Sequence, residues 1–268
     1  MPELVILSYE MIDELADQIL TDYFGTPRFP LKKIDVDAFA KNYLKLDVAY
    51  DQLCYGGEII YAVTAYKDSV VGFPKERPVV FKKVEKDTIL LDNALKAPGL
   101  APQRAFTMAH ECGHHAIAML APDTIKSHDF RSDYVTRDEI NEYWREWQAN
   151  TFASALLMPR YLVESMMLIS QHPEKFVIYD DKNVLEDERA EIRKLANMLG
   201  VSYTALLYRL KKLNLVERYS YQDYIYDAAD EIGLEGTLFG SFCHRSRIPR
   251  TGPKRARPAT GGILVNCG

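Results

Sequence analysis

Apolar side chains recur every three or four residues in several segments of the chain, a spacing that places them on one face of an α-helix. Over residues 9–24 this stripe follows Ser8, a residue type that caps helix N-termini, and ends at Gly25. The same pattern predicts further helices at 35–44, 102–120, 139–157, 160–170, 186–199 and 203–214. The helical pattern therefore dominates after residue 102.

Short runs of β-branched and aromatic residues lie between the second and third predicted helices, separated by glycine, proline or charged residues. The runs are 46–50, 58–66, 78–84 and 88–92. We therefore predict an α+β fold, with a small, mostly antiparallel sheet packed on the 102–120 helix and a C-terminal helical module that resembles a helix-turn-helix.

Three regions are predicted from this pattern: a first domain at 1–170 that includes the predicted sheet, the helical module at 171–240, and a tail at 241–268. The tail holds six basic residues and no acidic one, and it is rich in glycine and proline. We expect it to be disordered, with a nucleic-acid arm as the alternative.

Composition narrows the class of protein. The chain has 268 residues, a net charge of −5, 47% hydrophobic residues and 4 cysteines with no CxxC pair. No uncharged apolar run reaches the roughly 18 residues needed to cross a bilayer, and the first residues lack the basic start of a signal peptide. We expect a cytoplasmic protein without membrane contact, whose acidic body does not favour broad contact with nucleic acid.

The string AHECGHH, centred in the predicted 102–120 helix, carries the most informative residues. His110 and His114 are four residues apart, so on a helix both imidazoles reach one zinc ion. Glu111 lies one position round the helix, where its carboxylate takes a proton from a zinc-activated water as that water attacks a carbonyl. The pattern predicts Glu111 as the catalytic base.

A catalytic zinc site needs a third protein ligand and one open position. The sequence HExxHxxGxxH would supply a third histidine, but Ile117 and Leu120 stand where that pattern requires glycine and histidine. Glu146, in the predicted 139–157 helix, is the candidate instead. Glu142 and Glu139 lie nearby on the same helix and remain alternatives.

Further residues have candidate roles around the metal. Asn150 lies one turn after Glu146 and is placed to hydrogen-bond a ligand imidazole, or is an ordinary helix-face amide. His128 and Tyr134 lie in the polar stretch 121–138, a suspected flap, where either can donate to the developing oxyanion or be an ordinary loop residue. Cys112 is expected to be a small buried helix residue.

The strings RAFTMAHECGHH and EWQANTFASALLMP together resemble the ImmA/IrrE zinc metallopeptidases, whose usual wording is RFTxAHExGH and ExEANxFAxxLLMP. The resemblance extends over about residues 9–218, through IDELADQIL and LANMLGVSYTALLYRLKKLNLV. Cys112 and Gln148 depart from the family wording. The resemblance implies His110, His114 and Glu146 as ligands of Zn²⁺, and Glu111 as the base. It also implies a cytoplasmic protease that cleaves a helix-turn-helix repressor in a mobile element or a stress response.

Residues 190–215 leave a second function open. Gly200 and Ser202 fit the turn and the cap of a helix-turn-helix, and basic residues follow on the second helix: Arg209, Lys211 and Lys212. The segment either docks DNA or a repressor, or it packs on the peptidase domain. The alternative function is therefore a DNA-binding or protein-binding regulator with a structural or vestigial zinc site. A third is a phage or toxin–antitoxin component that acts by protein contact alone.

The run TILLD at 88–92 has two interpretations in such a peptidase. It holds an extended substrate by strand addition at the sheet edge, or it is an internal strand of the core.

Overall fold

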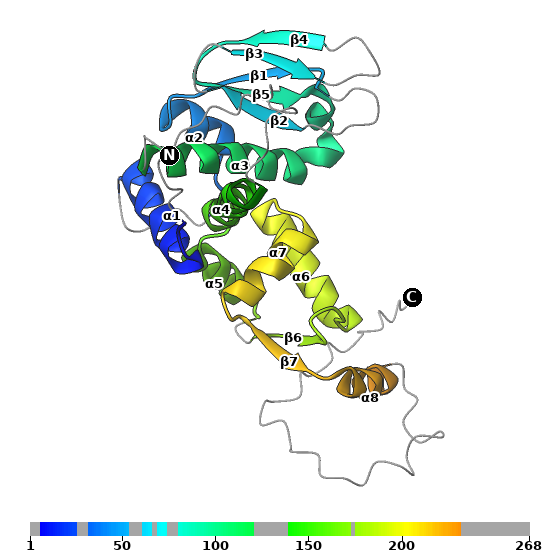
Figure 1. The fold of residues 1–268 in the computed structure, drawn as a ribbon. Helices are drawn as coiled ribbons and strands as arrows, with labels where there is room; N and C mark the ends of the chain where they lie inside the picture. Colours follow the sequence, from blue (N-terminus) through cyan, green and yellow to red (C-terminus); the bar gives the residue numbers. More distant parts are fainter. Residues whose placement is uncertain are drawn as a thin grey trace, which may run out of the picture. The chain divides into compact units, whose positions relative to one another are not determined.

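Figure 1 shows the computed structural model of the chain, which describes residues 6–25, 32–53, 61–65, 69–73, 80–120, 139–172 and 175–231. The chain forms two compact units, Met1–Tyr224 and Ile225–Gly268. Of the second unit only the end of one helix is described.

The described helices follow the predicted segments closely. They are α1 (Tyr9–Phe24), α2 (Val36–Asn42), α3 (Ala101–Leu120), α4 (Glu139–Leu157), α5 (Arg160–Ile169), α6 (Glu186–Leu199), α7 (Tyr203–Lys212) and α8 (Tyr221–Glu231). Two short 3₁₀ turns, η1 (Asn93–Lys96) and η2 (Pro98–Leu100), lead into α3. The sequence analysis did not predict α8.

Side-chain and glycine caps set the helix ends. Ser8 accepts a hydrogen bond from the backbone N–H of Met11, and Gly25 ends α1 in the left-handed region at φ +66°. Asp35 caps α2 in the same way, through the N–H of Ala38. The predicted starts of both helices are confirmed.

The strands form three small sheets. They are β1 (Asp47–Asp51), β2 (Ala62–Ala65), β3 (Ser69–Phe73), β4 (Val80–Val84), β5 (Thr88–Asp92), β6 (Phe176–Tyr179) and β7 (Val216–Tyr219). The main sheet has the order β1-β5-β2, while β3 pairs with β4 and β6 pairs with β7. Sequence analysis predicted neither β3 nor the β6–β7 pair.

The α+β class is confirmed, but the pairing is more mixed than "mostly antiparallel". β2 runs antiparallel to β5, whereas β1 runs parallel to it, and β6 is parallel to β7. The run TILLD is β5, the central strand, and all five of its residues are buried. Its backbone is paired on both sides, so it is an internal strand, and the interpretation as a substrate-binding edge is wrong.

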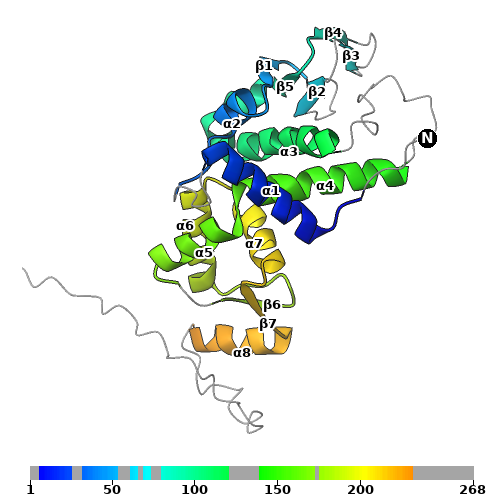
Figure 2. The same cartoon turned by 90° about the vertical axis from the view of Figure 1, so that its left-hand side faces the viewer.

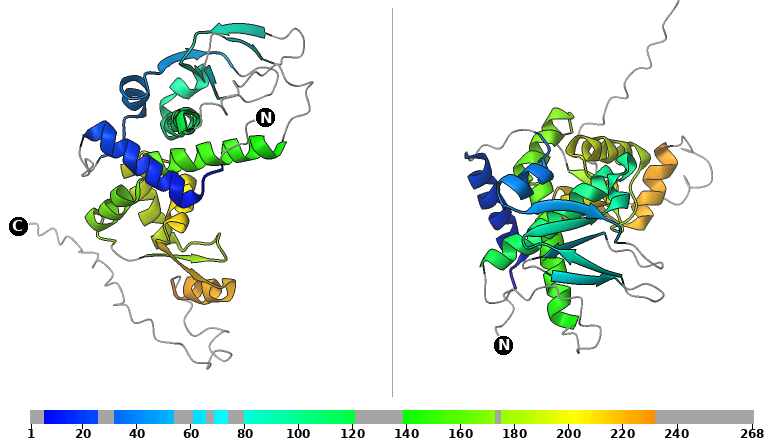
Figure 3. Two further views of the ribbon diagram at one scale, coloured as in Figure 1. Left: turned by 60° about the vertical axis from the view of Figure 1, so that its left-hand side comes forward. Right: turned by 90° about the horizontal axis from the view of Figure 1, so that it is seen from above.

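Helix α3 lies between the main sheet and α4, as Figures 1 and 2 show from perpendicular directions. Figure 3 (left) looks almost along α3, with the strands on one side of it and α4 on the other. The main hydrophobic core joins apolar residues of α1 to α7 and of β5, among them Ile89, Leu91 and Phe152. One face of α3 is therefore fixed against the sheet and another against α4.

The helical region after α5 has the turn predicted for a helix-turn-helix. α6 ends at Gly200, whose φ is +71°, and Ser202 accepts the N–H of Ala205 at the start of α7. Arg209, one of the three basic residues noted on the second helix, is 1% exposed. Its burial favours the alternative in which this segment packs on the rest of the protein.

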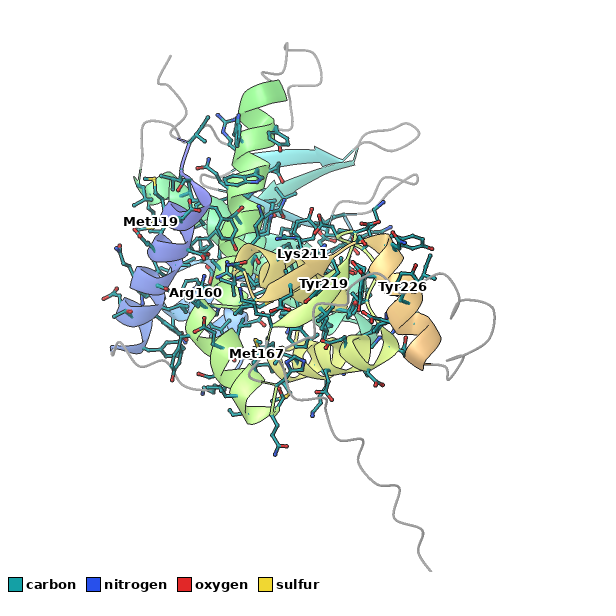
Figure 4. All side chains as sticks on the ribbon, turned by 90° about the horizontal axis from the view of Figure 1, so that it is seen from below. Met119, Arg160, Met167, Lys211, Tyr219 and Tyr226 are labelled. Carbon is teal, nitrogen blue, oxygen red and sulfur yellow. The ribbon has the colours of Figure 1, made fainter. Side chains whose placement is uncertain are left out.

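Arg209 joins three helices that are distant in sequence. Its side chain donates to the carbonyl of Met158 at the end of α4, to the hydroxyl of Tyr9, and to Asp13 Oδ1 at 2.6 Å. Lys211 donates to the carbonyl of Asp181. Figure 4 shows Lys211 on α7, and Arg160 beside α1.

Within the described residues, no single helix is both long and apolar enough to span a membrane. One helix pair, Tyr143–Leu157 with Arg160–Ile169, meets the length and composition criteria only when taken together, across a bend of 42°. The suspected flap 121–138, with His128 and Tyr134, and the tail 241–268 lie outside the described residues. The domain boundary at 170/171 stays a prediction.

Candidate metal centre

Helices α3 and α4 bring three ligand-type side chains together. His110 Nε2 and His114 Nε2 are 3.0 Å apart. The two oxygens of Glu146 each approach one of these nitrogens at 3.2 Å, Oε2 that of His110 and Oε1 that of His114. The three residues are a group that can hold a metal ion.

The spacing fits a small tetrahedral metal. Zinc bonds of 2.0–2.1 Å place neighbouring ligand atoms about 3.3 Å apart. The histidine nitrogens are 3.0 Å apart, and each lies 3.2 Å from a different oxygen of Glu146. One ligand atom from each residue lies within 4.8 Å of the other two, which is close enough for the three residues to share one ion. Among the described residues the group consists of these three side chains, the number of protein ligands that a catalytic zinc site uses.

The group is open to solvent on one side. The Glu146 side chain is 41% exposed, whereas those of His110 and His114 are 16% and 10% exposed. The carboxylate is therefore the most solvent-accessible member of the group, and the two imidazoles are largely enclosed by the protein.

Asn150 lies one turn after Glu146 and contacts His110 from the far side of the ring. His110 Nδ1 is 3.0 Å from Asn150 Oδ1. With Nδ1–H donating to this amide oxygen, the Nε2 lone pair faces the other two ligands. The predicted role of Asn150 is to hydrogen-bond a ligand imidazole, and this contact with His110 has the required distance.

The charges of the group favour an ionised carboxylate. Burial raises the pKa of Glu146, but hydrogen bonds from His110 and His114 outweigh it and hold the pKa well below its usual range. Burial lowers the pKa of His110, and the hydrogen bond to Glu146 with the charge of Glu111 outweighs that effect, so the net pKa is raised. The anionic oxygens that stabilise a proton on this imidazole are equally suited to a cation.

The side chain of Glu111, next to His110 on α3, contacts the sheet. It is 8% exposed, and its Oε2 accepts a hydrogen bond of 2.6 Å from the hydroxyl of Thr64 on β2. Sequence analysis missed Thr64, because no local pattern links a strand residue to a helix residue 47 positions away.

Gly113 is the second residue whose contribution was missed. It lies on the face of α3 that contacts α4, next to the backbone of Ala149. Because it has no side chain, the two helices approach closely enough for Glu146 to reach both histidines. The signal was present in the string HECGHH, as a glycine in the middle of a strong helical pattern.

Gln148, the departure from the family wording, is also explained. It is 1% exposed, and its Oε1 accepts the backbone N–H of Leu7 at 2.8 Å. The residue two positions after Glu146 therefore fixes the segment before α1.

Some of the remaining candidates lie in the part of the chain that the structure describes, and the others do not. Cys112 is buried, as expected, and burial raises the pKa of its thiol. His115 is not part of the metal group. The side chains of Glu139 and Glu142, and all of His128 and Tyr134, lie outside what the structure describes.

A helix with two histidines and a second helix with a glutamate, beside a small sheet, form a candidate metal centre. Residues 86–211 match the family model of the IrrE N-terminal-like domain, Peptidase_M78. The predicted resemblance to this peptidase family is therefore confirmed for residues 86–211. The matched region contains α3, α4 and the whole metal group.

A solved structure, a Mycobacterium tuberculosis transcriptional regulator, aligns with 75% of this chain and 46% of its own length, at 19% identity and a TM-score of 0.41. The chain thus spans less than half of that protein, and nothing about its activity transfers. No curated protein matches the chain at a significant level.

Proposed function

We propose that this chain is a zinc-dependent endopeptidase that cleaves a helix-turn-helix transcriptional repressor in the cytoplasm. The single observation that carries the enzymatic part is the convergence of His110, His114 and Glu146, with the buried Glu111 on the same helix as the two histidines. The repressor as substrate rests on the family resemblance alone.

The protein groups divide the reaction between them. His110, His114 and Glu146 would hold the metal, which when bound supplies a Lewis acid for the substrate carbonyl and lowers the pKa of water. Glu111 takes a proton from the water whose oxygen bonds to the carbonyl carbon. It then gives this proton to the amine nitrogen as the C–N bond breaks. Asn150 keeps His110 in the tautomer that offers Nε2.

Two variants test this assignment. Glu146→Ala is expected to lose most of the one zinc per chain that the wild-type protein binds, as measured by elemental analysis of protein purified without added metal. Glu164→Ala, which removes an exposed carboxylate paired with Arg160 on α5, is the matched control and is expected to keep its zinc. Unchanged zinc in Glu146→Ala would remove this residue from the site.

Turnover is tested separately with Glu111→Gln. This variant is expected to keep zinc and to lose cleavage of purified helix-turn-helix repressors, with products identified by mass spectrometry. Cleavage at the wild-type rate would exclude Glu111 as the base.

The second candidate function is a DNA-binding regulator, which the α6–Gly200–α7 turn favours. Against it, Arg209 is buried, Lys211 binds the Asp181 carbonyl, and the Lys212 ammonium lies 5.3 Å above the Tyr9 ring. The basic groups of α7 are thus largely committed to contacts within the chain. Specific nanomolar binding to duplex DNA at physiological salt would favour the regulator.

A further inference from the structure

The hydroxyl of Thr64 and the carboxylate of Glu111 form a buried hydrogen bond between the sheet and α3. The donor–acceptor distance is 2.6 Å, and the two residues are 5% and 8% exposed. Because a hydrogen bond to a carboxylate is stronger than one between neutral groups, this contact constrains the carboxylate firmly.

The register of the sheet explains why the hydroxyl points at α3. β2 pairs with β5 so that Thr64 lies opposite Ile89, which belongs to the core on the α3 side of the sheet. Side chains alternate between the two faces of a strand. Val63 and Ala65 accordingly join a separate apolar cluster on the other face.

The position of the hydroxyl is unusual for that face. Ile89 and Leu91, the β5 residues on the same side, are 0% exposed and apolar. A hydroxyl among them costs free energy unless it has a partner, and the same holds for the buried carboxylate opposite. Each of the two groups therefore satisfies the other.

We propose that Thr64 is a positioning residue that holds Glu111 for proton transfer, an inference that rests on the proposed function. The bond to Oε2 fixes the carboxylate. Among the described residues no hydrogen bond reaches the other oxygen, which is left to accept the proton from water. Thr64 touches neither the metal group nor the substrate in this role and acts only through Glu111.

The alternative is that this hydrogen bond contributes to folding alone. The two interpretations differ in what happens when only the hydroxyl is removed. A purely structural bond lowers stability but leaves the position of Glu111 and the turnover of the folded protein unchanged. A positioning bond changes kcat while KM and zinc content stay constant.

The experiment compares Thr64→Val, which removes the hydroxyl at nearly constant volume, with Thr64→Ser, which keeps it. Thr64→Ala removes the same hydroxyl with a smaller side chain and serves as the second variant if Thr64→Val does not fold. The matched control is Thr88→Val on β5, since Thr88 is also buried but its hydroxyl contacts the carbonyl of Lys86 at 3.4 Å, not Glu111.

Three quantities are measured for each variant: the Glu111 side-chain position in zinc-free crystals, the zinc content per chain, and kcat and KM with a purified helix-turn-helix repressor. For Thr64→Val we expect Glu111 to shift or to occupy several rotamers. We expect kcat to fall by about 10–100-fold at unchanged KM and zinc content. Thr64→Ser is expected to restore both the position and kcat to within about threefold.

Glu111 unmoved and kcat unchanged in Thr64→Val would overturn the proposal, as would an equal loss of kcat in Thr88→Val. If the wild-type protein binds no zinc or cleaves no repressor, the proposed function fails on that result. The role in proton transfer then fails with it. The position of Glu111 in the zinc-free crystals separately tests whether Thr64 holds the carboxylate, and an unmoved Glu111 in Thr64→Val overturns that part as well.

Discussion

A Cβ atom on Gly113 would lie 3.0 Å from the carbonyl oxygen of Ala149 and 3.2 Å from its Cα. Both contacts are with backbone, which cannot rotate away as a side chain can. Helices α3 and α4 therefore meet at a separation that only glycine permits, and the metal ligands lie on both sides of this contact.

Gly113→Ala is expected to weaken the metal site more than the fold. The added methyl must push α4 away by a few tenths of an ångström, which separates Glu146 from the two histidines. We expect zinc affinity to fall by about tenfold and Tm by about 2–4 °C, as measured by competition with a chelator and by calorimetry. Gly99→Ala is the control, because nothing lies within 4 Å of a Cβ at that position. Equal zinc affinity in both variants would contradict this prediction.

Removing the amide that orients His110 is expected to reduce zinc affinity without loss of helix content. In Asn150→Ala the Nδ1 of His110 loses its partner at 3.0 Å, so the ring and its tautomer are less restricted. Such changes typically cost about 10–100-fold in metal affinity. The comparison is with Asn197→Ala, an exposed amide on α6, and a loss of similar size in both proteins would argue against a role for Asn150.

The Arg209 side chain is expected to contribute strongly to the free energy of unfolding. Arg209→Ala leaves the carbonyl of Met158 and the partly buried carboxylate of Asp13 without their donor, which we expect to cost about 2–3 kcal/mol, below the range for a fully buried pair because Asp13 is 22% exposed. Urea unfolding at neutral pH measures this loss. Arg193→Ala, which breaks an exposed pair with Glu186, is expected to cost less than about 1 kcal/mol.

Alkaline pH is expected to destabilise the fold through Cys112. Burial raises the pKa of this thiol above its ordinary value, so the folded state keeps the proton that the unfolded chain releases above about pH 8.5. The unfolded state then binds fewer protons, and the free energy of unfolding falls by up to about 1.4 kcal/mol per pH unit. The contribution is complete below pH 8.5 and is lost as pH rises.

Cys112→Ala lacks this group and provides the control. Urea unfolding at pH 7, 9 and 10 is expected to show a steeper decline in the wild-type protein than in the variant. Parallel declines would mean that the thiol titrates normally.

Patterns among neighbouring residues were enough to predict most of the helices and two of the three residues of the metal group. The caps at Ser8 and Gly25, and the four-residue spacing of the histidines, involve neighbours along one helix, and each predicted feature was found. Glu146 required only one further assumption, that consecutive strong helices pack on each other.

Features that depend on distant pairing could not be predicted in the same way. β6 and β7 have four residues each and are separated by two helices, so neither has a pattern distinct from a loop. The burial of Arg209 depends on Asp13, 196 residues earlier. A basic residue at a helix surface position gives no local sign that an acid will meet it.

The contact between Arg209 and α1 has a consequence for transplanting parts of this protein. Tyr9 and Asp13 belong to α1 and Arg209 to α7, about 200 residues later, yet they form one hydrogen-bonded group with the carbonyl of Met158, directly after α4. A chimera that exchanges α6 and α7 alone separates a guanidinium from its acceptors. A chimera that keeps this group intact must exchange α1 together with α7. The unit that can be transferred is therefore this pair of helices and not a contiguous stretch of sequence.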